Sequence, residues 1–167
     1  TGVKRICPEC LVISYQGDGD LAAIGTAEII HAANRGENIT VIFVNNCVYG
    51  MTSGQMAPTT LLGQKTTTTP TGRNEKLHGY PLKVCELLAT IEGVKFLART
   101  AVHTPVHVLK TKRAIKKAFQ LQLAQAGFTL VEILSMCPTN WGVSSQAAVK
   151  WIEEKMLPVF PLKERDR

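Results

Sequence analysis

The sequence lacks long apolar runs, and it has few aromatic residues and only five cysteines. No apolar stretch approaches the roughly 20 residues that a helix needs to span a membrane, and no charged segment followed by an apolar one opens the chain as a leader would. An odd number of cysteines without a compact framework fits a reducing compartment better than a disulfide scaffold. We therefore expect a cytoplasmic globular protein with no membrane partner.

Positive charge is in excess, with 19 lysines and arginines against 13 acidic residues. Much of the excess lies in a helix-like stretch, residues 105–126, at Lys110, Lys112, Arg113, Lys116 and Lys117. No aromatic residue interleaves with this cluster, and no nucleic-acid-binding motif accompanies it. We expect a solvated helix face and no nucleic-acid partner, although a basic surface also steers acidic protein partners.

The order of the expected elements indicates the fold class. With 167 residues, 45% of them hydrophobic, the chain is long enough for one core, and we expect a single domain over residues 1–167. Short apolar runs that indicate strands alternate with stretches of helical periodicity. The expected strands are 11–15, 40–44, 95–101 and 128–134, and the expected helices are 20–34, 81–91, 105–126 and 144–156. This alternation predicts an α/β fold with a doubly wound, mostly parallel sheet.

Two short strings carry most of the chemical information. GDGD at residues 17–20 and NN at residues 45–46 each follow an apolar run of strand length. A strand, helix, strand unit of this size makes a right-handed crossover between parallel strands. Asp18 and Asn46 are therefore expected at the same carboxyl edge of the sheet, where open α/β sheets bind their ligands.

A clamp for a metal ion and a diphosphate explains these residue types. A diphosphate at a helix amino terminus meets free backbone N–H groups, and Gly17 and Gly19 let the backbone come close. Asp18 would repel a diphosphate unless a divalent cation lay between them, and Mg²⁺ is commonly shared between carboxylates and phosphate oxygens. The side-chain oxygen of Asn46 and the carbonyl oxygen of Val48, on an exposed turn, are candidates for two further ligands.

Two other interpretations of these strings compete with the clamp. GDGDLA at residues 17–22 fits the permissive G-x-G-x-x-A form of the dinucleotide fingerprint. The acidic residue expected to bind the ribose is absent, however, because Asn45 and Asn46 stand at the end of the second strand. An Asp-Gly turn followed by an Asn-rich turn, with no ligand, is the simplest alternative. The position of both strings directly after strands favours the clamp.

Longer strings resemble a known family. The spacing from GDG to NN resembles the thiamine diphosphate motif, which many thiamine enzymes share. The strings YQGDGDLAAIGTAEIIHAANRGENITVIFVNN, VYGMTSGQMAPTT, GQKTTTTP and CPTNWG resemble the β subunit of 2-oxoacid:ferredoxin oxidoreductases, and the resemblance covers nearly the whole chain. It implies the diphosphate-binding module of the thiamine diphosphate fold.

The resemblance implies an enzyme that oxidatively decarboxylates a 2-oxoacid to an acyl-CoA and CO₂, with electrons passing through iron-sulfur clusters to ferredoxin. It implies an α subunit with the pyrimidine-binding domain and the activating glutamate, so that this chain holds no catalytic base, and possible small γ and δ subunits. The substrate is expected to be 2-oxoglutarate or a branched-chain 2-oxoacid rather than pyruvate. A non-oxidative thiamine decarboxylase or carboligase is the alternative. The implied cofactor-binding residues are Gly17, Asp18, Gly19, Asp20, Asn46, Val48, Tyr49, Gly50 and Met51.

Cysteines at two places are candidate metal ligands. By resemblance, Cys137 is a possible ligand of a [4Fe-4S] cluster, which normally takes four thiolates; without the family, a lone cysteine after a strand is more often a small buried hydrophobe. Cys7 and Cys10 form a lone C-x-x-C, a weak signal, and a turn with two incidental thiols is expected. The family's other cluster ligands lie upstream of the segment that Thr1 resembles, so the chain is expected to lack its amino-terminal part.

The segment from residue 46 to residue 80 is the longest without regular periodicity. Loops of this length inside compact domains are usually functional or disordered. We expect an active-site and subunit-contact loop rather than a flexible linker, with residues 49–51 near the thiazolium and residues 52–55 near the substrate side chain. Exposed or capping roles are expected for His103 and His107.

Overall fold

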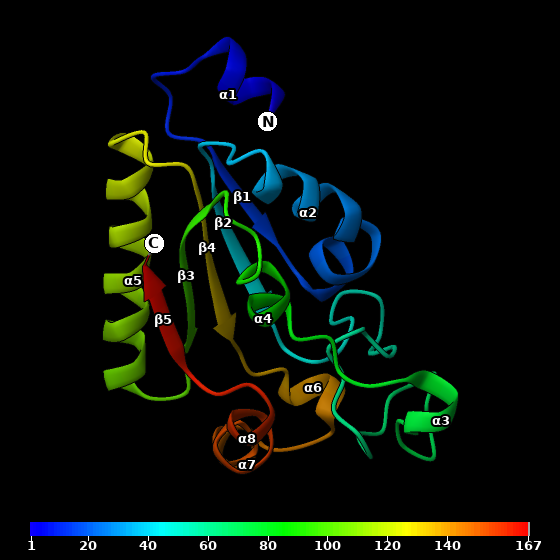
Figure 1. Ribbon diagram of the computed structural model, residues 1–167. Helices are drawn as coiled ribbons and strands as arrows, with labels where there is room; N and C mark the ends of the chain where they lie inside the picture. Colours follow the sequence, from blue (N-terminus) through cyan, green and yellow to red (C-terminus); the bar gives the residue numbers. More distant parts are fainter. Residues whose placement is uncertain (167) are drawn as a thin grey trace.

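One five-stranded sheet organises the computed structural model, which describes residues 1–166 (Figure 1). The strand order is β1-β2-β4-β3-β5, and the first four strands run parallel, whereas β5 pairs with β3 in the antiparallel direction. The strands are β1 (Ile13–Gln16), β2 (Thr40–Asn45), β3 (Val94–Ala101), β4 (Phe128–Leu134) and β5 (Lys163–Asp166). The predicted doubly wound, mostly parallel sheet is confirmed.

Helices cover both faces of this sheet. On one face α2 (Thr26–Asn34) and α4 (Val84–Leu88) pack over apolar side chains of β2 and β4, such as Phe43 and Leu130. On the other face α5 (Pro105–Leu123) packs its small residues Ala114 and Ala118 against β3 and β4 (Figure 1). Because both faces are covered, β2, β3 and β4 are almost entirely buried, as parallel strands require.

The remaining helices gather mostly at the carboxyl end of the parallel strands. This end carries α3 (Glu75–His78), α6 (Pro138–Trp141), α7 (Ser145–Trp151) and α8 (Leu157–Val159), whereas α1 (Gly2–Ile6) lies at the opposite end (Figure 1). A π-helical turn, η2 (Ile152–Met156), joins α7 to α8. A third apolar cluster, which includes Leu61, Ile152 and Phe160, anchors this end against the last residues of β3 and β4.

Several expected elements differ from the observed ones. The first strand was expected to be buried, but β1 is an edge strand and its Tyr15 is 73% exposed. The expected helix over residues 20–34 begins as a π-helical turn, η1 (Asp20–Ile24), and breaks at Gly25, where a β-carbon would collide with the carbonyl oxygen of Asp20. The helix expected over residues 81–91 shortens to α4, and the antiparallel β5 has no counterpart among the expected elements.

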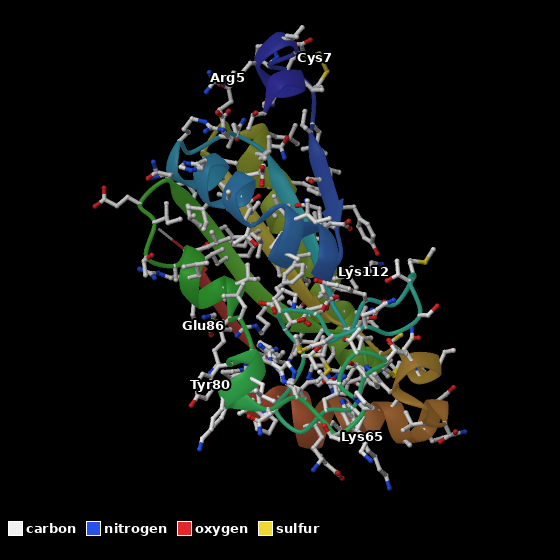
Figure 2. All side chains as sticks on the ribbon, turned by 90° about the vertical axis from the view of Figure 1, so that its right-hand side faces the viewer. Arg5, Cys7, Lys65, Tyr80, Glu86 and Lys112 are labelled. Carbon is white, nitrogen blue, oxygen red and sulfur yellow. A yellow bond between two sulfur atoms is a disulfide. The ribbon has the colours of Figure 1, made fainter. Side chains whose placement is uncertain are left out.

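Cys7 and Cys10 are not the two incidental thiols that were expected, because their sulfurs are joined in a disulfide. The turn that carries them is closed by Lys4, whose Nζ donates to the carbonyl oxygens of Pro8 and Cys10. Figure 2 places Cys7 at the end of the molecule opposite Lys65 of the long loop. The disulfide is therefore remote from the carboxyl edge of the sheet.

Of the two histidines beside α5, His107 takes part in the helix cap, and His103 has neither of the expected roles. Thr104 caps the helix by accepting a hydrogen bond from the backbone N–H of His107, and the imidazole of His107 also contacts this hydroxyl. An exposed or capping role was expected for His103, but it is 6% exposed, and its ring stacks on that of His107 at 4.2 Å between centroids. Among residues 1–166 no helix is both long and apolar enough to cross a membrane.

Candidate functional site

A cavity of about 910 Å³ lies at the carboxyl edge of the sheet. Every residue predicted to bind the cofactor lines it: residues 17–20, Asn46 and residues 48–51, together with Cys137. The loops that follow β1, β2 and β4 supply these residues, because parallel neighbours end at the same edge. The structure thus brings together residues as far apart in the chain as Gly17 and Cys137, which are 120 positions apart.

Asp18 is the most buried charged group of this cavity, with 3% of its surface exposed. Its Oδ2 accepts hydrogen bonds from the Cys47 backbone N–H at 3.0 Å and from the Thr59 hydroxyl at 2.5 Å, whereas Oδ1 has only a long contact of 3.4 Å to the Asn46 backbone N–H. Burial raises the pKa of the carboxyl group to about 6, against the opposing effect of these hydrogen bonds. No lysine, arginine or histidine of residues 1–166 forms an ion pair with it.

The turn after β2 presents two further oxygens beside Asp18. The Asn46 side-chain oxygen accepts from the Val48 backbone N–H at 3.2 Å, which fixes the amide in a local turn. Val48 is 1% exposed, so the expected exposed turn is in fact buried. Within the described chain, no donor forms a hydrogen bond to the Val48 carbonyl oxygen. A buried carboxylate without a cation and a buried carbonyl without a donor together fit a hard divalent metal ion, which takes oxygen ligands.

The start of the helical segment after β1 differs from expectation in one detail. The Gly17 backbone N–H is not free for a diphosphate, because it donates to Asp20 Oδ2 at 2.9 Å. Gly19 serves a packing purpose, since a β-carbon there would meet the ring of Tyr49 at 3.4 Å. Burial, followed by the charge of Asp18, raises the pKa of the Tyr49 hydroxyl. The phenol ring therefore lies against the backbone of the GDGD string.

The long loop after β2 is held in place by a buried arginine and is not a flexible linker. Arg73 is 5% exposed, and its guanidinium donates to six backbone carbonyl oxygens, those of Ala57, Pro58, Thr60, His78, Gly79 and Tyr80. This arrangement places Thr59 against Asp18 and lets the side chains of Thr60 and Gln64 donate to the Cys47 carbonyl oxygen. The loop therefore completes one wall of the site.

Cys137 lies beside Gly50 in the wall of the cavity and is partly exposed. Its sulfur accepts from Asn140 Nδ2 at 3.2 Å, and the same amide donates to the Gly50 carbonyl oxygen at 3.0 Å. Within residues 1–166, the one group of three or more potential ligands close enough to share a metal ion is Cys7, Glu9 and Cys10, which lies elsewhere. The described chain thus supplies one thiol at the cavity, and a [4Fe-4S] cluster there does not fit these residues alone, because it normally takes four thiolates.

Four residues that contribute to the site were not predicted from the sequence. Thr59 and Cys47 hold Asp18, Asn140 links Cys137 to Gly50, and Trp141 donates from Nε1 to the Asn46 carbonyl oxygen at 3.0 Å. Asn140 and Trp141 belong to the CPTNWG string, which did carry a family signal. Thr59 sits in a threonine-rich loop, and no local pattern distinguishes it from its neighbours.

Comparisons with known proteins place the chain among thiamine pyrophosphate enzymes. The family model described as "Thiamine pyrophosphate enzyme, C-terminal TPP binding domain" matches residues 1–133. The chain is 49% identical to "Ketoisovalerate oxidoreductase subunit VorA" of Methanothermobacter thermautotrophicus, covering 100% of this chain and 35% of that protein. It is 37% identical to "2-oxoglutarate synthase subunit KorB" of Methanocaldococcus jannaschii, covering 98% and 58% respectively. The chain thus spans between about a third and somewhat more than half of these relatives.

A solved structure shares the fold. The "2-oxoglutarate:ferredoxin oxidoreductase from Magnetococcus marinus with 2-oxoglutarate, coenzyme A and succinyl-CoA bound" superimposes with a TM-score of 0.71 and 31% identity, over 83% of this chain and 43% of that one. The predicted resemblance to the β subunits of 2-oxoacid:ferredoxin oxidoreductases is confirmed at the level of these similarities. Because the family model matches most of its length, the chain belongs to the C-terminal TPP-binding domain family of thiamine pyrophosphate enzymes.

Proposed function

We propose that this chain is the diphosphate- and Mg²⁺-binding domain of the β subunit of a 2-oxoacid:ferredoxin oxidoreductase. One observation carries the proposal: the buried Asp18 carboxylate, which lacks a counter-cation in the described chain, lies beside the unpaired Val48 carbonyl in a cavity of about 910 Å³. Relatives named as ketoisovalerate and 2-oxoglutarate oxidoreductase subunits support the reaction class. The complete enzyme would convert a 2-oxoacid and coenzyme A to an acyl-CoA and CO₂ and pass electrons to ferredoxin.

In this proposal three oxygens of the chain hold the metal ion: Asp18 Oδ1, Asn46 Oδ1 and the Val48 carbonyl. Asp18 Oδ1 is available because its nearest donor in the described chain is 3.4 Å away, while Oδ2 is fixed by Cys47 and Thr59. Residues 17, 19 and 20 lie where the diphosphate would meet the backbone. The metal ion would offset the charge repulsion between Asp18 and the diphosphate.

The same cavity would orient the reactive end of the cofactor. Thiamine diphosphate, when bound, supplies the carbon nucleophile and the electron sink for decarboxylation. Tyr49, Gly50 and the fully exposed Met51 form the part of the wall nearest to residues 52 and 53. We assign them to contacts with the thiazolium, and Thr52 and Ser53 to contacts with the substrate side chain. No catalytic base is assigned to this chain, and the activating glutamate is assigned to an α subunit.

Further partners follow from the reaction. The relatives' names as subunits support an assembly with an α subunit, and the bound coenzyme A named for the solved neighbour supports an acyl acceptor. The proposal also includes ferredoxin, small γ and δ subunits, and a [4Fe-4S] cluster with Cys137 as one ligand. The remaining thiolates of that cluster would come from outside residues 1–166. We assign residues 1–167 to a single domain of a longer, cytoplasmic polypeptide, with 2-oxoglutarate or a branched-chain 2-oxoacid as substrate.

Calorimetric titration of thiamine diphosphate with Mg²⁺ tests the proposal, using the complete β subunit assembled with its α partner. We expect Mg²⁺-dependent binding that is lost in Asp18→Ala and Asn46→Ala, both folded by circular dichroism. Asn34→Ala, at the end of α2 and away from the cavity, is the matched control and keeps binding. Unchanged binding in the two site variants would remove Asp18 and Asn46 from the site and refute the clamp.

A further inference from the structure

A buried polar chain runs from the metal-binding turn into the middle of the sheet. Asn45 Nδ2, at the end of β2, donates to Glu132 Oε1 on β4 at 2.8 Å, and Arg99 Nε on β3 donates to Glu132 Oε2 at 2.7 Å. Asn45 and Glu132 are fully buried and Arg99 is 1% exposed. Three neighbouring strands thus contribute one side chain each to this chain of buried hydrogen bonds.

The chemistry of Glu132 fixes the orientation of the Asn45 amide. An ionised carboxylate accepts hydrogen bonds and cannot donate them, so the NH₂ group of Asn45 must face Glu132. The amide oxygen then faces the other way, where it accepts from the Cys47 backbone N–H at 3.1 Å. The same N–H lies 3.0 Å from Asp18 Oδ2. Glu132 thus fixes which end of the Asn45 amide faces the Cys47 N–H, and this N–H also contacts the carboxylate of the proposed metal site.

Cys47 needs such support, because it is a non-glycine residue in the left-handed region, with φ of 60°. This conformation is disfavoured by the β-carbon and persists only where surrounding contacts stabilise it. Cys47 lies between Asn46 and Val48, so its backbone conformation decides where both proposed ligand oxygens point. The strained turn and the metal site are one structural unit.

Arg99 is held from its other side. Its Nη1 and Nη2 donate to the Glu86 carboxylate at 2.9 and 2.6 Å, and Lys163 on β5 pairs with the same carboxylate at 2.7 Å. Glu86 lies on α4 (Figure 2). The guanidinium therefore remains beside Glu132, where it forms a fully buried ion pair with Oε2 and leaves Oε1 to accept from Asn45.

We propose that Glu132, paired with Arg99, is a positioning residue for the metal site: it orients Asn45, and Asn45 stabilises the left-handed turn that aims Asn46 and Val48. This inference rests on the proposed function, because it concerns the same metal site. It assigns a role to two charged residues that contact neither the metal ion nor the cofactor.

The isosteric variant Glu132→Gln tests whether the site needs a side chain at this position that accepts hydrogen bonds and donates none. To keep its bond to the charged Arg99, the introduced glutamine must present its oxygen there and its NH₂ group to Asn45. Asn45 then has to turn its oxygen towards the glutamine, and its NH₂ group faces the Cys47 N–H, so two donors oppose each other. We expect the Kd for Mg²⁺, at saturating thiamine diphosphate, to rise about ten-fold or more, since partners behind metal ligands typically contribute about 10- to 100-fold.

Two further variants separate positioning from general loss of stability. Leu130→Ala removes a buried side chain on the same strand and face as Glu132, and it should lower the unfolding temperature without changing the Kd for Mg²⁺. Asn45→Asp combined with Glu132→Gln exchanges donor and acceptor, since the introduced aspartate would accept from both the introduced glutamine and the Cys47 N–H. We expect this double variant to regain roughly a third or more of the wild-type affinity, because every hydrogen bond is restored.

Titrations on the complete subunit in its complex, at a temperature where all variants are folded, distinguish the outcomes. A Glu132→Gln variant that binds Mg²⁺ as tightly as wild type would overturn the inference while leaving the proposed function intact. An equal rise in the Kd for Mg²⁺ in Leu130→Ala would also overturn it, as would a double variant that recovers no affinity for Mg²⁺. Absence of Mg²⁺-dependent binding in the wild-type protein would instead refute the proposed function and the inference with it.

Discussion

Replacement of Asp18 by asparagine should make the metal-free protein more stable at neutral pH. The carboxyl group is 3% exposed, and burial raises its pKa from 3.8 to about 6. The folded state therefore binds a proton more tightly than the unfolded state does, so the ionised carboxylate destabilises the fold. Below 3.8 both states are protonated and the penalty vanishes; it grows as the pH rises towards 6 and is complete above that value.

The magnitude follows from the two pKa values. The interval between 3.8 and about 6 corresponds to about 3 kcal/mol, at about 1.4 kcal/mol for each tenfold change in proton affinity. Asp18→Asn removes the charge with little change of shape. We expect its free energy of unfolding to exceed that of wild type by up to about 3 kcal/mol at pH 8, with the difference shrinking towards zero near pH 4.

Urea denaturation in the presence of a chelator, repeated across this pH range, measures the difference. With Mg²⁺ and thiamine diphosphate, the wild-type protein should become more stable than Asp18→Asn. A ligand at about 1,000 times its Kd adds about 4 kcal/mol to the free energy of unfolding of the protein that binds it. Glu92→Gln, at an exposed position, is the control and should show no such pH-dependent gain. A difference that is independent of pH, or a wild-type protein that is more stable than Asp18→Asn without metal at pH 8, would refute the reasoning.

Three further predictions concern other parts of the fold: the long loop, the disulfide and the cap of α7. Arg73→Met leaves buried carbonyl oxygens without donors, so we expect a loss of about 3 kcal/mol or more in the free energy of unfolding and faster limited proteolysis within residues 57–80; unchanged proteolysis would contradict this account. Cys7→Ser with Cys10→Ser opens a short covalent loop and should cost no more than about 2 kcal/mol, with the thiamine diphosphate Kd unchanged in calorimetry; a weaker Kd would show that the disulfide end is coupled to the site. Ser144→Ala removes the cap of α7, where Ser144 Oγ accepts from the Ala147 N–H at 3.2 Å, and should lower stability by about 1 kcal/mol in urea denaturation, again with an unchanged Kd; no change in stability would mean that water replaces the cap at no cost.

The parts of the fold that follow from local sequence were predictable. β2 and β4 are continuous apolar runs that end in turns, and α5 has Thr104 as its cap and proline at its start, so their bounds came out within a few residues. The GDGD and NN strings were placed correctly at one edge because the crossover rule constrains parallel strands. Local pattern and long-range topology agreed in these elements.

Other parts depend on contacts that periodicity does not encode. The π-helical turn at Gly25 arises from a close approach to the Asp20 carbonyl, and an apolar run such as residues 11–15 reads the same at an edge as in the centre of a sheet. The charged strand β5 forms because β3 offers it an open edge and Lys117 pairs with Glu164 and Asp166. Thr59 reaches Asp18 only once the long loop has folded.

Arg73 makes this long loop a single cooperative unit. Its guanidinium binds carbonyl oxygens before and after it in the chain, in residues 57–60 and 78–80, so neither of these stretches can leave without breaking its hydrogen bonds to Arg73. Backbone amides throughout the segment should therefore share one opening equilibrium in hydrogen exchange rather than fray gradually. Because Thr59 belongs to the same unit, the hydroxyl beside Asp18 is either fully in place or absent, and access to the cavity on this side is governed by one event rather than by many small motions.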